Sequence, residues 1–364
     1  MDKNRGKNAQ KVICAMSGGV DSSVAAALLK RAGFDVVGVF MKFWHDSGGE
    51  KSGNWNRCCS PESENRARKV AKILKIPFYV FNFEKEFKKR IVDCSLKEYK
   101  AGRTPNPCVI CNKEIKFGLL LEKALKLNAD YIATGHYAKK QKVENRKQKV
   151  EYRLLQAKDE EKDQSYFLWM LTQRQLKRAL FPIGDYTRKK VEKLARKFRL
   201  PVLKAKKSVE ICFIETTIND FLKKYLKTRP GKILRKNGKM VGEHNGLWFY
   251  TIGQRKGIEL AGGPYYVLDK NLKKNILIVT KNENDLYKKE LIIKNINWIS
   301  GKEPRLPLRI KAKIRYRHNS AMATLNRLKP LSSLRFKLSQ RSITPGQSVV
   351  FYRGQELLGG GIIC

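Results

Sequence analysis

The sequence predicts an α/β domain with a parallel sheet, followed by a small β-rich domain and a C-terminal β-barrel. In the first half, short apolar stretches alternate with amphipathic helical stretches, which is typical of helices covering a parallel sheet. After about Cys212 the pattern changes to short stretches of β-type residues separated by turn residues. At about 150 residues per domain, a chain of 364 residues holds two or three domains. We expect them at residues 1–212, 213–280 and 281–364.

Apolar stretches bounded by turn residues predict the strands. In the first half they lie at Lys11–Met16, Asp35–Met41, Pro77–Phe83 and Asp130–Thr134. In the second half they lie at Leu247–Ile252, Pro264–Leu268, Asn275–Thr280, Glu290–Ile299, Leu308–Arg317, Leu334–Leu338 and Ser348–Tyr352. The charged segment Lys139–Lys149 predicts the tip of a hairpin or a surface loop.

Three helices are predicted from periodicity and capping residues. The Ala- and Leu-rich stretch Ser23–Arg31 should form a helix that Gly33 closes. A second helix should begin at Ser60-Pro61, an N-cap serine followed by proline at the first helical position. Its apolar residues recur at helical spacing, as Ala67, Val70, Ala71 and Leu74. Thr187–Arg199 is the third amphipathic stretch.

The charge balance indicates a polyanionic partner. The formal net charge is +44, from 77 Lys and Arg against 33 Asp and Glu. Between Lys302 and Arg341, 12 basic residues accompany one acidic residue, Glu303. Nucleic acid is the simplest partner for such a charge, and a membrane surface or an evenly spread charge are the alternatives. The hydrophobic content of 42% excludes a disordered chain.

The sequence also predicts the cellular compartment of the protein. No apolar segment of signal-peptide length precedes the first predicted strand, and no run of 18 apolar residues predicts a membrane span. We therefore expect a cytoplasmic protein with no membrane partner, and a monomer by default. In the cytoplasm the 8 cysteines should mostly be reduced, so prominent ones are candidates for catalysis or metal binding.

The segment Ala15–Ser23, AMSGGVDSS, predicts a phosphate-binding loop between a strand and a helix. Gly18 and Gly19 allow a tight backbone whose N–H groups converge on an anion, and the helix N-terminus adds its dipole. The Gly-Lys-Ser/Thr ending of a Walker A loop is absent. The segment instead resembles the PP-loop, SGGxDS, of ATP pyrophosphatases, which split ATP between the α and β phosphates. An ordinary glycine-rich turn is the alternative.

Further residues at the ends of predicted strands are candidates for contact with a nucleotide. In PP-loop enzymes the adenine lies over the carboxyl ends of the strands, as at other open α/β sheets. Met41 ends one strand and would contact the base, or is simply a core methionine. Gly135 follows another strand, at a place where a close approach between the backbone and the nucleotide would be useful. His136 would meet a phosphate, or is a loop histidine whose hydrogen bonds are satisfied internally.

Six cysteines are candidates for a site: Cys58, Cys59, Cys94, Cys108, Cys111 and Cys212. Cys108 and Cys111 form a C-x-x-C motif, compatible with half a zinc site, a redox pair or a catalytic thiol with a neighbour. The adjacent pair Cys58-Cys59 has a poor spacing for the second half of a zinc site. Cys212 is either a buried small apolar residue or a second reactive thiol. Sulfur transfer needs two thiols that can meet.

Taken together, these residues resemble the bacterial tRNA-specific 2-thiouridylases, members of the PP-loop ATP pyrophosphatase superfamily. The resemblance runs from about Lys11 to Ile363 and implies an adenine nucleotide alpha hydrolase-like first domain. Besides the PP-loop, it is carried by VGVFMKFW, CCSPES, YKAGRTPNPCVICNKEIKFG, ADYIATGHYA, KDQSYFL, FPIGDYT, ICFI, YTIGQRKG, RYR, ITPGQSVVFY and LGGGII.

The resemblance implies a mechanism. The enzyme would adenylate the C2 oxygen of the wobble uridine of tRNA and then insert sulfur, giving 2-thiouridine, AMP and pyrophosphate. Cys212 would receive persulfide sulfur from an upstream donor or relay protein. Cys111 would act as the nucleophile on that persulfide, leaving a transient Cys111–Cys212 disulfide. ATP, accompanied by Mg²⁺ and with no tightly bound cofactor, would contact Ala15, Met16, Ser17, Gly18, Gly19, Val20, Asp21, Ser22, Met41 and Gly135.

The resemblance also implies how tRNA is held. Asn106, Pro107 and Cys108 match the segment that contacts the target base. Further tRNA contacts match His136, Lys162, Asp163, Gln164, Arg315, Tyr316 and Gln347. One departure lies before Cys212, where the family commonly has Asp-Ser and this chain has Lys207-Ser208. That change puts in doubt a carboxylate role in this loop.

Two other classes remain compatible with parts of the sequence. Another PP-loop ligase, such as an amidotransferase or an argininosuccinate-type synthetase, would need neither paired cysteines nor an RNA surface. A zinc-containing RNA-binding protein would hold metal and release no AMP. The sequence specifies neither the sulfur donor nor the tRNAs that are modified, and it assigns no role to Cys58 and Cys59.

Overall fold

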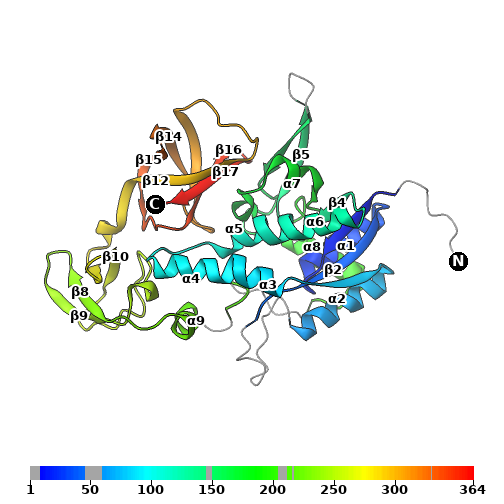
Figure 1. The fold of residues 1–364 in the computed structure, drawn as a ribbon. Coiled ribbons are helices and arrows are strands. Elements are labelled where there is room, and N and C mark those ends of the chain that lie inside the picture. Colours follow the sequence, from blue (N-terminus) through cyan, green and yellow to red (C-terminus); the bar gives the residue numbers. More distant parts are fainter. Residues whose placement is uncertain (1–8, 46–59, 145–149, 204–210, 215–216, 329) are drawn as a thin grey trace.

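A computed structural model of the chain describes residues 9–45, 60–144, 150–203, 211–214, 217–328 and 330–364 (Figure 1). The segment with Cys58 and Cys59, the Lys207-Ser208 departure and the end of the predicted loop Lys139–Lys149 lie outside these residues. No helix in the described part of the chain is both long and apolar enough to span a membrane.

In the part of the chain that the structure describes, the first domain contains a five-stranded parallel sheet in the order β3-β2-β1-β4-β7. Its strands are β1 (Lys11–Ala15), β2 (Asp35–Lys42), β3 (Phe78–Asn82), β4 (Tyr131–Ala133) and β7 (Ala179–Leu180). The central strand β1 is almost wholly buried, which explains why it is a continuous apolar run in the sequence. The predicted parallel α/β fold is confirmed.

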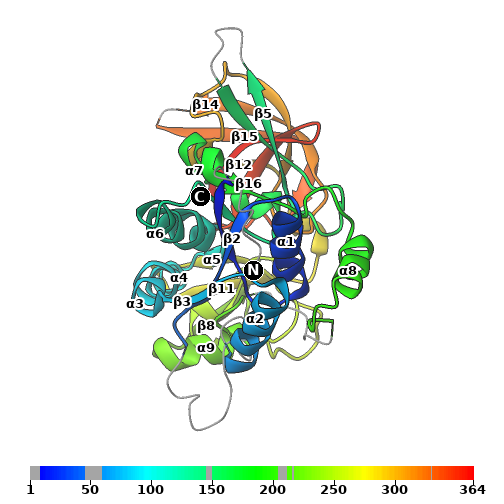
Figure 2. The same ribbon diagram turned by 90° about the vertical axis from the view of Figure 1, so that its right-hand side faces the viewer.

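Helices cover both faces of this sheet (Figure 2). One face carries α1 (Val20–Arg31), α2 (Pro61–Leu74) and α8 (Arg188–Lys197), whose apolar residues share one core cluster. The other face carries two helical runs and one short helix. The first run is α3 (Glu84–Phe87), η2 (Lys88–Val92) and α4 (Asp93–Lys100). The second run is α5 (Pro107–Cys111), η3 (Asn112–Leu119) and α6 (Leu120–Lys126), and the short helix is α7 (Gln173–Arg178). The predicted cap is confirmed, because Ser60 Oγ accepts a hydrogen bond from the Ser63 amide and Pro61 begins α2.

A second, smaller domain follows with α9 (Ile218–Tyr225) and a four-stranded sheet in the order β10-β11-β8-β9. Its strands are β8 (Gly231–Arg235), β9 (Met240–His244), β10 (Tyr266–Asn271) and β11 (Ile276–Thr280). Ile233, Val267, Leu277 and Val279 are fully buried and form its apolar centre. In Figure 1 this domain lies below the barrel and beside the tip of α4.

The C-terminal domain is a closed barrel of six of the described strands, in which the first strand pairs with the last. The strands are β12 (Tyr287–Trp298), β13 (Leu308–Lys313), β14 (Ala321–Leu328), β15 (Leu331–Arg341), β16 (Ser348–Arg353) and β17 (Glu356–Ile363). The neighbouring hairpin β5 (Lys139–Glu144) and β6 (Val150–Leu155) extends this sheet, because β6 pairs with β17. A strand pair from the first half of the sequence thus connects the α/β domain to the barrel.

A buried contact reinforces that connection. The turn η4 (Ser165–Leu168) and the following Trp169 pack against β16 and β17. Trp169 is fully buried and its indole N–H donates to Ser348 Oγ at 3.0 Å, while the Tyr166 hydroxyl donates to the Ser348 carbonyl at 2.9 Å. These polar groups are therefore hydrogen-bonded inside an apolar contact. The interface between the two domains thus resembles the interior of a single domain.

Two predicted strands differ from the structure. Leu247–Ile252 is not a strand: η5 (Leu247–Phe249) is a 3₁₀ turn, entered through Gly246 with φ +151°. Leu247, Phe249 and Tyr250 are all buried, so this run is apolar because it lies in the core and not because it alternates in a sheet. The predicted strand Leu308–Arg317 ends at Lys313, before a turn in which Arg317 has φ +33°.

Several strands were not predicted, and β17 shows why. Its sequence, ELLGGGII, contains three consecutive glycines, which weaken a strand pattern. An added Cβ at Gly360 would lie 2.9 Å from the Trp169 ring, and one at Gly361 would lie 2.3 Å from Ile293. Tertiary packing therefore selects glycine here. β5, β6, β8, β9 and β14 are half-exposed and charged, which hides their alternation.

We predict that Trp169→Ala destabilises the protein by about 3–5 kcal/mol, because it removes a fully buried indole and leaves Ser348 Oγ without its donor. Urea unfolding monitored by circular dichroism measures this loss. Leu338→Ala is the control, since Leu338 is 71% exposed and its truncation should change stability by less than about 0.5 kcal/mol. Equal effects of the two substitutions would contradict this account of the domain contact.

Candidate functional site

The predicted phosphate loop, Ala15–Ser22, connects β1 to α1 at the carboxyl edge of the parallel sheet. Gly18 has φ +70°, and an added Cβ would lie 2.1 Å from the carbonyl oxygen of Ser63 in the first turn of α2. Both backbone conformation and space therefore require glycine at this position. The loop is confined between the N-terminal turns of α1 and α2, where helix dipoles favour an anion.

Serine hydroxyls hold the loop in shape through hydrogen bonds to its own backbone. Ser22 Oγ accepts a hydrogen bond from the Ser17 amide at 3.1 Å, and Ser23 Oγ donates to the Gly19 carbonyl at 2.8 Å. Ser22 and Ser23 are both buried. Because these bonds already fix the loop, an anion would bind to it with a small loss of conformational entropy.

Arg66 of α2 also holds the loop, a role that no sequence motif indicates. Its guanidinium Nε donates to the Gly18 carbonyl at 3.2 Å, and Nη2 donates to Ser63 Oγ at 2.7 Å. These contacts turn the Gly18 carbonyl oxygen toward α2. A cation beside the loop also complements a polyanionic nucleotide. In the sequence, Arg66 is one of several basic residues on a polar helix face, so only the fold distinguishes it.

The carboxylate of Asp21, predicted to bind ATP, is engaged by two residues of the α/β domain. It accepts hydrogen bonds from the Tyr137 hydroxyl at 2.8 Å and from Arg188 Nη1 of α8 at 2.7 Å. Burial, and then the charge of Asp21, raises the pKa of Tyr137, so its phenol remains a donor. Asp21 therefore ties the first turn of α1 to α8 and to the chain that follows β4.

Gly135 lies directly against the phosphate loop. An added Cβ on Gly135 would lie 2.6 Å from the backbone nitrogen of Ser22. The close approach expected at this position is therefore present, with the loop as the neighbouring backbone. Met41 is the penultimate residue of β2, half-buried against the core cluster of the helical face that carries α5. Met16 is buried beneath the loop, and its amide donates to the Val39 carbonyl at 2.8 Å.

His136 is a buried, hydrogen-bonded histidine. Its Nδ1 lies 2.7 Å from Thr134 Oγ1, and its ring packs near Phe117 and Phe181. Burial, followed by repulsion from Lys116, lowers the pKa of His136 well below its usual range. The imidazole is therefore neutral near pH 7 and would meet RNA as a hydrogen-bonding group rather than as a cation.

The two cysteines expected to transfer sulfur lie on the same side of the sheet. Cys111 ends α5 and is buried within the core cluster of that side, and Cys212 is half-buried and packs against the same cluster. Phe213, next to Cys212, contacts Phe87 at 5.9 Å between ring centroids. Phe87 precedes η2, which packs against α5. Cys108 is half-buried on the first turn of α5.

The residues expected at the target base lie where the barrel meets the α/β domain. Asn106 is the residue before α5, and its side chain is hydrogen-bonded to the Tyr166 hydroxyl. Pro107 is buried at the first position of α5, where its missing N–H costs nothing. The Tyr316 ring lies 4.4 Å from the ring of Phe167, the neighbour of Tyr166. The structure thus brings Asn106 and Tyr316 to one aromatic cluster.

The loop with Lys162, Asp163 and Gln164 divides its side chains between protein and solvent. Lys162 is exposed. Asp163 is 3% exposed, and its carboxylate accepts hydrogen bonds from the Ala157 amide at 3.0 Å and from Ser165 Oγ at 2.7 Å. Gln164 Oε1 accepts from the Tyr137 amide at 3.0 Å. The carboxylate of Asp163 therefore shapes the loop, and the charge of Lys162 faces solvent.

Arg315 and Gln347 are also engaged within the protein. Arg315 Nη2 donates to the Ser342 carbonyl and to Thr344 Oγ1, and burial is the main cause that lowers the pKa of its guanidinium. Gln347 Nε2 donates to the Thr104 carbonyl at 2.9 Å and to the Pro105 carbonyl at 3.2 Å. Gln347 therefore holds the backbone just before α5, and Arg315 holds the barrel loop at Ser342 and Thr344.

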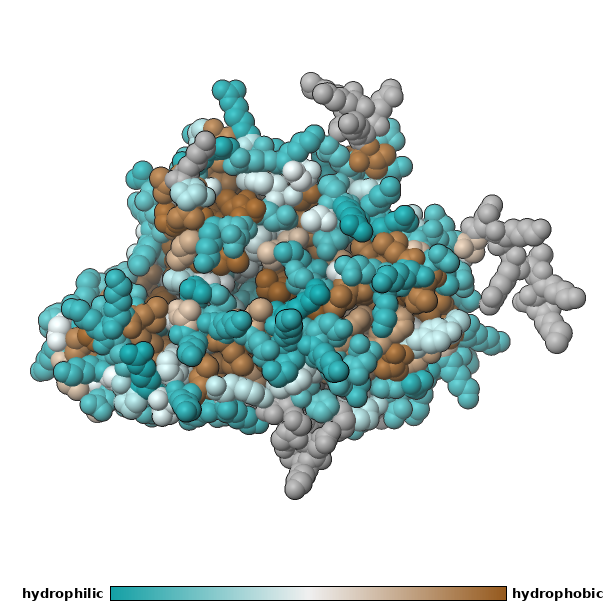
Figure 3. Space-filling view, viewed as in Figure 1, coloured by the Kyte–Doolittle hydropathy of each residue, from teal (hydrophilic) through white to brown (hydrophobic). Residues whose placement is uncertain are grey.

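Charge and polarity dominate the surface. Figure 3 shows hydrophilic side chains across most of one face, with apolar patches where the barrel meets the helices. Within the described ranges, no group of three or more His, Cys, Asp and Glu side chains is placed to hold a metal ion. The geometry offers a glycine- and serine-rich loop at two helix N-termini and cysteines on one side of the sheet, in a chain of strongly positive net charge, a combination suited to phosphate and thiol chemistry.

Protein families match almost the entire chain. Residues 10–216 match the family described as the tRNA methyl transferase HUP domain. Residues 219–281 match the tRNA methyl transferase PRC-barrel domain, and residues 288–363 match the aminomethyltransferase β-barrel domain. The order of the matched families follows the α/β domain, the small β domain and the barrel.

Individual relatives are similar over nearly their full length. The tRNA-specific 2-thiouridylase MnmA of Clostridium perfringens is 45% identical over 365 residues, covering 97% of this chain and 98% of the relative. The tRNA-specific 2-thiouridylase MnmA 1 of Caldanaerobacter subterraneus subsp. tengcongensis is 47% identical over 361 residues, covering 97% of both chains. That of Shouchella clausii is 44% identical over 359 residues, covering 97% of this chain and 96% of the relative.

We predict that Gly18→Ala abolishes ATP binding, because the new methyl group would collide with the Ser63 carbonyl and displace the loop. Gly33→Ala is a matched control: Gly33 also has positive φ, +86°, but nothing lies within 4 Å of an added Cβ. The control should lose about 1 kcal/mol of stability and keep ATP affinity. Isothermal titration with ATP measures both variants. Equal ATP affinity of Gly18→Ala and wild type would contradict this account of the loop.

Proposed function

Because this chain belongs to the tRNA-specific 2-thiouridylase family, we propose that it replaces the C2 oxygen of the wobble uridine of tRNA with sulfur at the expense of ATP. It is a tRNA-uridine 2-sulfurtransferase. In the proposed reaction ATP is split into pyrophosphate and an adenylyl group, which is transferred to the C2 oxygen. That oxygen then leaves with AMP as sulfur takes its place.

The observation that carries this proposal is the direction of the helix that contains Cys111. Residues 107–126 form one continuous helical run, α5–η3–α6, which leads into the strand β4. In an α/β unit a helix runs antiparallel to the strand that follows it. Since Gly135, which follows the end of β4, lies beside the phosphate loop, the helix begins at that same edge of the sheet. The uridine activated at the loop would therefore lie near the first turns of α5.

We propose that residues 15–22 bind the ATP phosphates, with Met41 and Gly135 at the adenosine. The helix dipoles of α1 and α2 and the cation of Arg66 would stabilise the negative charge on the ATP phosphates. This includes the charge of the adenylyl group that is transferred and that of the pyrophosphate that is released. Splitting between the α and β phosphates makes the uridine C2 oxygen part of a good leaving group, AMP. Without this step the oxygen would not depart from a stable pyrimidine.

For sulfur transfer we propose that Cys212 carries the terminal sulfur as a persulfide and that Cys111 is the nucleophile. The Cys111 thiolate attacks the Cys212 sulfur, a Cys111–Cys212 disulfide forms, and the terminal sulfur leaves as hydrosulfide. Hydrosulfide attacks C2, and AMP departs with the former C2 oxygen. A dithiol reductant must reopen the disulfide before the next cycle. The strongly positive net charge of the chain would favour the thiolates.

We propose that tRNA lies across the barrel and the α/β domain. Its target uridine must leave the base stack to reach a pocket near α5, as is usual for enzymes that modify a base. Asn106, Pro107 and Cys108 would surround this base. The remaining tRNA contacts are assigned to His136, Lys162, Asp163, Gln164, Arg315, Tyr316 and Gln347. Those members whose side chains are bonded within the protein, Gln347 among them, act through the shape of their loops.

We further propose that Mg²⁺ arrives bound to ATP. The Asp21 carboxylate is occupied by Arg188 and Tyr137, so the phosphate oxygens and water would supply most of the ligands of this ion. The enzyme is placed in the cytoplasm as a monomer. We propose that it receives sulfur from a persulfide-carrying protein.

We predict that Cys111→Ser and Cys212→Ser each abolish 2-thiouridine formation when sulfur comes from a persulfide-carrying protein. Cys212→Ser should still release AMP, and inorganic sulfide should restore its product, because hydrosulfide can displace AMP directly. Cys94→Ser is the control, since Cys94 is exposed on α4 and lies in no motif. Nucleoside analysis of the tRNA and AMP quantification measure these outcomes. Full activity of Cys212→Ser with the persulfide donor would exclude the two-cysteine mechanism.

Salt should weaken tRNA binding steeply, because Lys and Arg contacts to phosphates release condensed counterions. With six or more phosphate contacts, the tRNA affinity should fall by roughly 10³-fold or more between 50 and 200 mM salt. Filter binding of unmodified tRNA measures this slope, and ATP binding to the enzyme alone serves as the comparison. A tRNA affinity that does not change over this range would contradict a phosphate-dominated interface.

A further inference from the structure

The segment 101–106, here named the strap, joins α4 to α5 and carries an unusual set of contacts. It belongs to the α/β domain, yet its backbone groups are bonded by both of the other domains. Arg103 anchors it to α4 through two hydrogen bonds to the Glu98 carboxylate, at 2.6 and 2.7 Å. Its last residue, Asn106, directly precedes α5 and therefore the Cys108–Cys111 motif.

The small β domain holds the first half of the strap. Lys270 of β10 donates from Nζ to the Gly102 carbonyl at 3.0 Å, and Thr251 Oγ1 lies 3.2 Å from Thr104 Oγ1. Burial lowers the pKa of Lys270 to about 8, which reflects an ammonium group largely removed from water. Gly102 has φ +73°, and an added Cβ would lie 2.5 Å from Leu272. The contact is therefore close as well as polar.

The barrel holds the second half. The Thr104 amide donates to the Pro345 carbonyl at 2.9 Å, and Gln347 Nε2 donates to the Thr104 and Pro105 carbonyls at 2.9 and 3.2 Å. An added Cβ at Gly346, which has φ +91°, would lie 2.9 Å from the Thr104 backbone. The two N–H groups of the Gln347 amide are thus both used on the strap.

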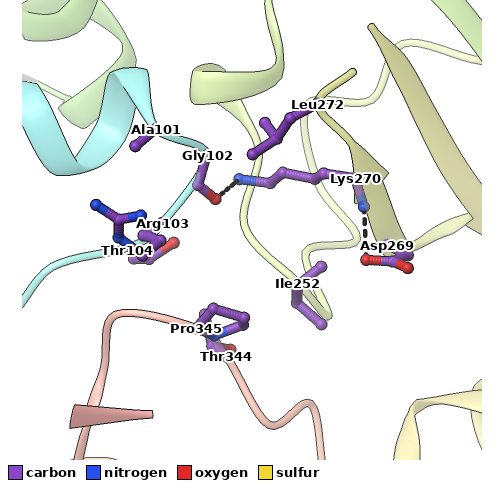
Figure 4. Close-up of a pocket in the computed structure, with 10 residues that line it drawn as sticks. All are labelled: Ala101, Gly102, Arg103, Thr104, Ile252, Asp269, Lys270, Leu272, Thr344 and Pro345. Atoms are coloured by element: carbon purple, nitrogen blue, oxygen red, sulfur yellow. Dashed lines mark hydrogen bonds between the residues drawn. The ribbon is translucent and has the colours of Figure 1, made fainter. Parts of the chain in front are cut away.

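A cavity marks the junction of the three domains. It has a volume of about 110 Å³ and is lined by the strap, by Ile252, Asp269, Lys270 and Leu272 of the small domain, and by Thr344 and Pro345 of the barrel. Figure 4 shows the Lys270 side chain crossing from its strand to the Gly102 carbonyl, with Thr344 and Pro345 on the opposite side. The strap is therefore held at points by directional hydrogen bonds and is not embedded in a continuous apolar core.

The barrel loop that bonds the strap also contacts a residue assigned to tRNA. Arg315 donates to the Ser342 carbonyl and to Thr344 Oγ1, which precede Pro345 and Gln347 in that loop. A ligand that moves Arg315 would therefore act on the strap through one short, hydrogen-bonded loop. Rigid prolines at positions 105 and 107 allow little of such a movement to be absorbed before α5.

We propose that the strap is a positioning element for sulfur transfer, in which Lys270 and Gln347 fix the start of α5. Asn106 is then held at the activated uridine, and Cys111 is held where it attacks the Cys212 persulfide. This inference rests on the proposed function. It assigns Gln347 to the protein's own backbone, and it gives Lys270 a role that no motif indicates. A displacement of about 1 Å of a reacting group can cost on the order of 10²-fold in rate, so small losses of strap geometry should be visible in the chemical step.

The test uses Lys270→Met and Gln347→Met, which keep side-chain length and remove the donors, with Lys273→Met as an exposed control on the same hairpin. Thr251→Val is a milder variant that removes a single hydroxyl contact. Single-turnover formation of 2-thiouridine is measured at saturating ATP and tRNA, together with AMP release and the dissociation constants of ATP and tRNA. Thermal melting checks that each variant is folded.

We expect Lys270→Met and Gln347→Met to slow 2-thiouridine formation by about 10- to 100-fold and to release more AMP per thiouridine, with ATP affinity unchanged. Thr251→Val should show a smaller effect in the same direction, and Lys270→Arg should recover most of the rate because it keeps a cationic donor. Lys273→Met should match wild type.

Wild-type single-turnover rates in folded Lys270→Met and Gln347→Met would overturn the proposal. So would a Gln347→Met variant that loses tRNA affinity but keeps its rate at saturating tRNA, since that result assigns Gln347 to direct RNA contact. If Lys270→Met and Gln347→Met do not fold, a wild-type rate and AMP ratio in Thr251→Val would overturn it equally. Failure of the wild-type enzyme to thiolate tRNA is a separate result, which would contradict the proposed function itself.

Discussion

Contacts that leave no room for a Cβ atom fix the loop at which we propose that the nucleotide binds, and the rest of the structure is arranged around them. Gly18 lies against the Ser63 carbonyl of α2, and Gly135 lies against the Ser22 amide. These approaches place the phosphate loop between two helix N-termini and beside the end of β4. Once the loop is fixed there, the helix that leads into β4 must begin near it, and this brings α5 with its two cysteines to the same edge of the sheet. The chemistry we propose depends on this shared edge, since one uridine has to reach both an adenylyl group and a thiol.

Specific hydrogen bonds join the three domains. Trp169 and Tyr166 of the α/β domain both bond to Ser348 of the barrel, and β6 pairs with β17. The strap receives hydrogen bonds from Lys270 and from Gln347. Buried polar groups that are fully paired specify one arrangement of neighbouring elements more strictly than apolar packing does. In the function we propose, the chain must align a large RNA with a small reactive centre, and strict alignment of the domains helps because the RNA would be held mainly through its own phosphates.

Much of the fold and of the phosphate loop could be predicted from the sequence, because both are specified locally. The glycines and serines of residues 17–22 act within one turn, and the strands of the parallel sheet are continuous apolar runs. The strand β17 could not be predicted, since its glycines are selected by Trp169 and Ile293, which lie far away in the chain. Leu247–Ile252 was predicted as a strand because buried turns can be as apolar as buried strands. Arg66, Arg188 and Lys270 could not be distinguished among the 77 basic residues, since their roles come from partners brought close only by the fold.

The central claim is that the phosphate loop and a pair of cysteines act on one uridine. The most direct measurement is a single turnover of wild-type enzyme with ATP, unmodified tRNA and a persulfide-carrying protein, in the absence of any reductant. Peptide mass spectrometry then quantifies the disulfide, while nucleoside analysis quantifies 2-thiouridine. The account predicts one Cys111–Cys212 disulfide and one AMP for each 2-thiouridine formed. Formation of 2-thiouridine while Cys111 and Cys212 both remain thiols would contradict it.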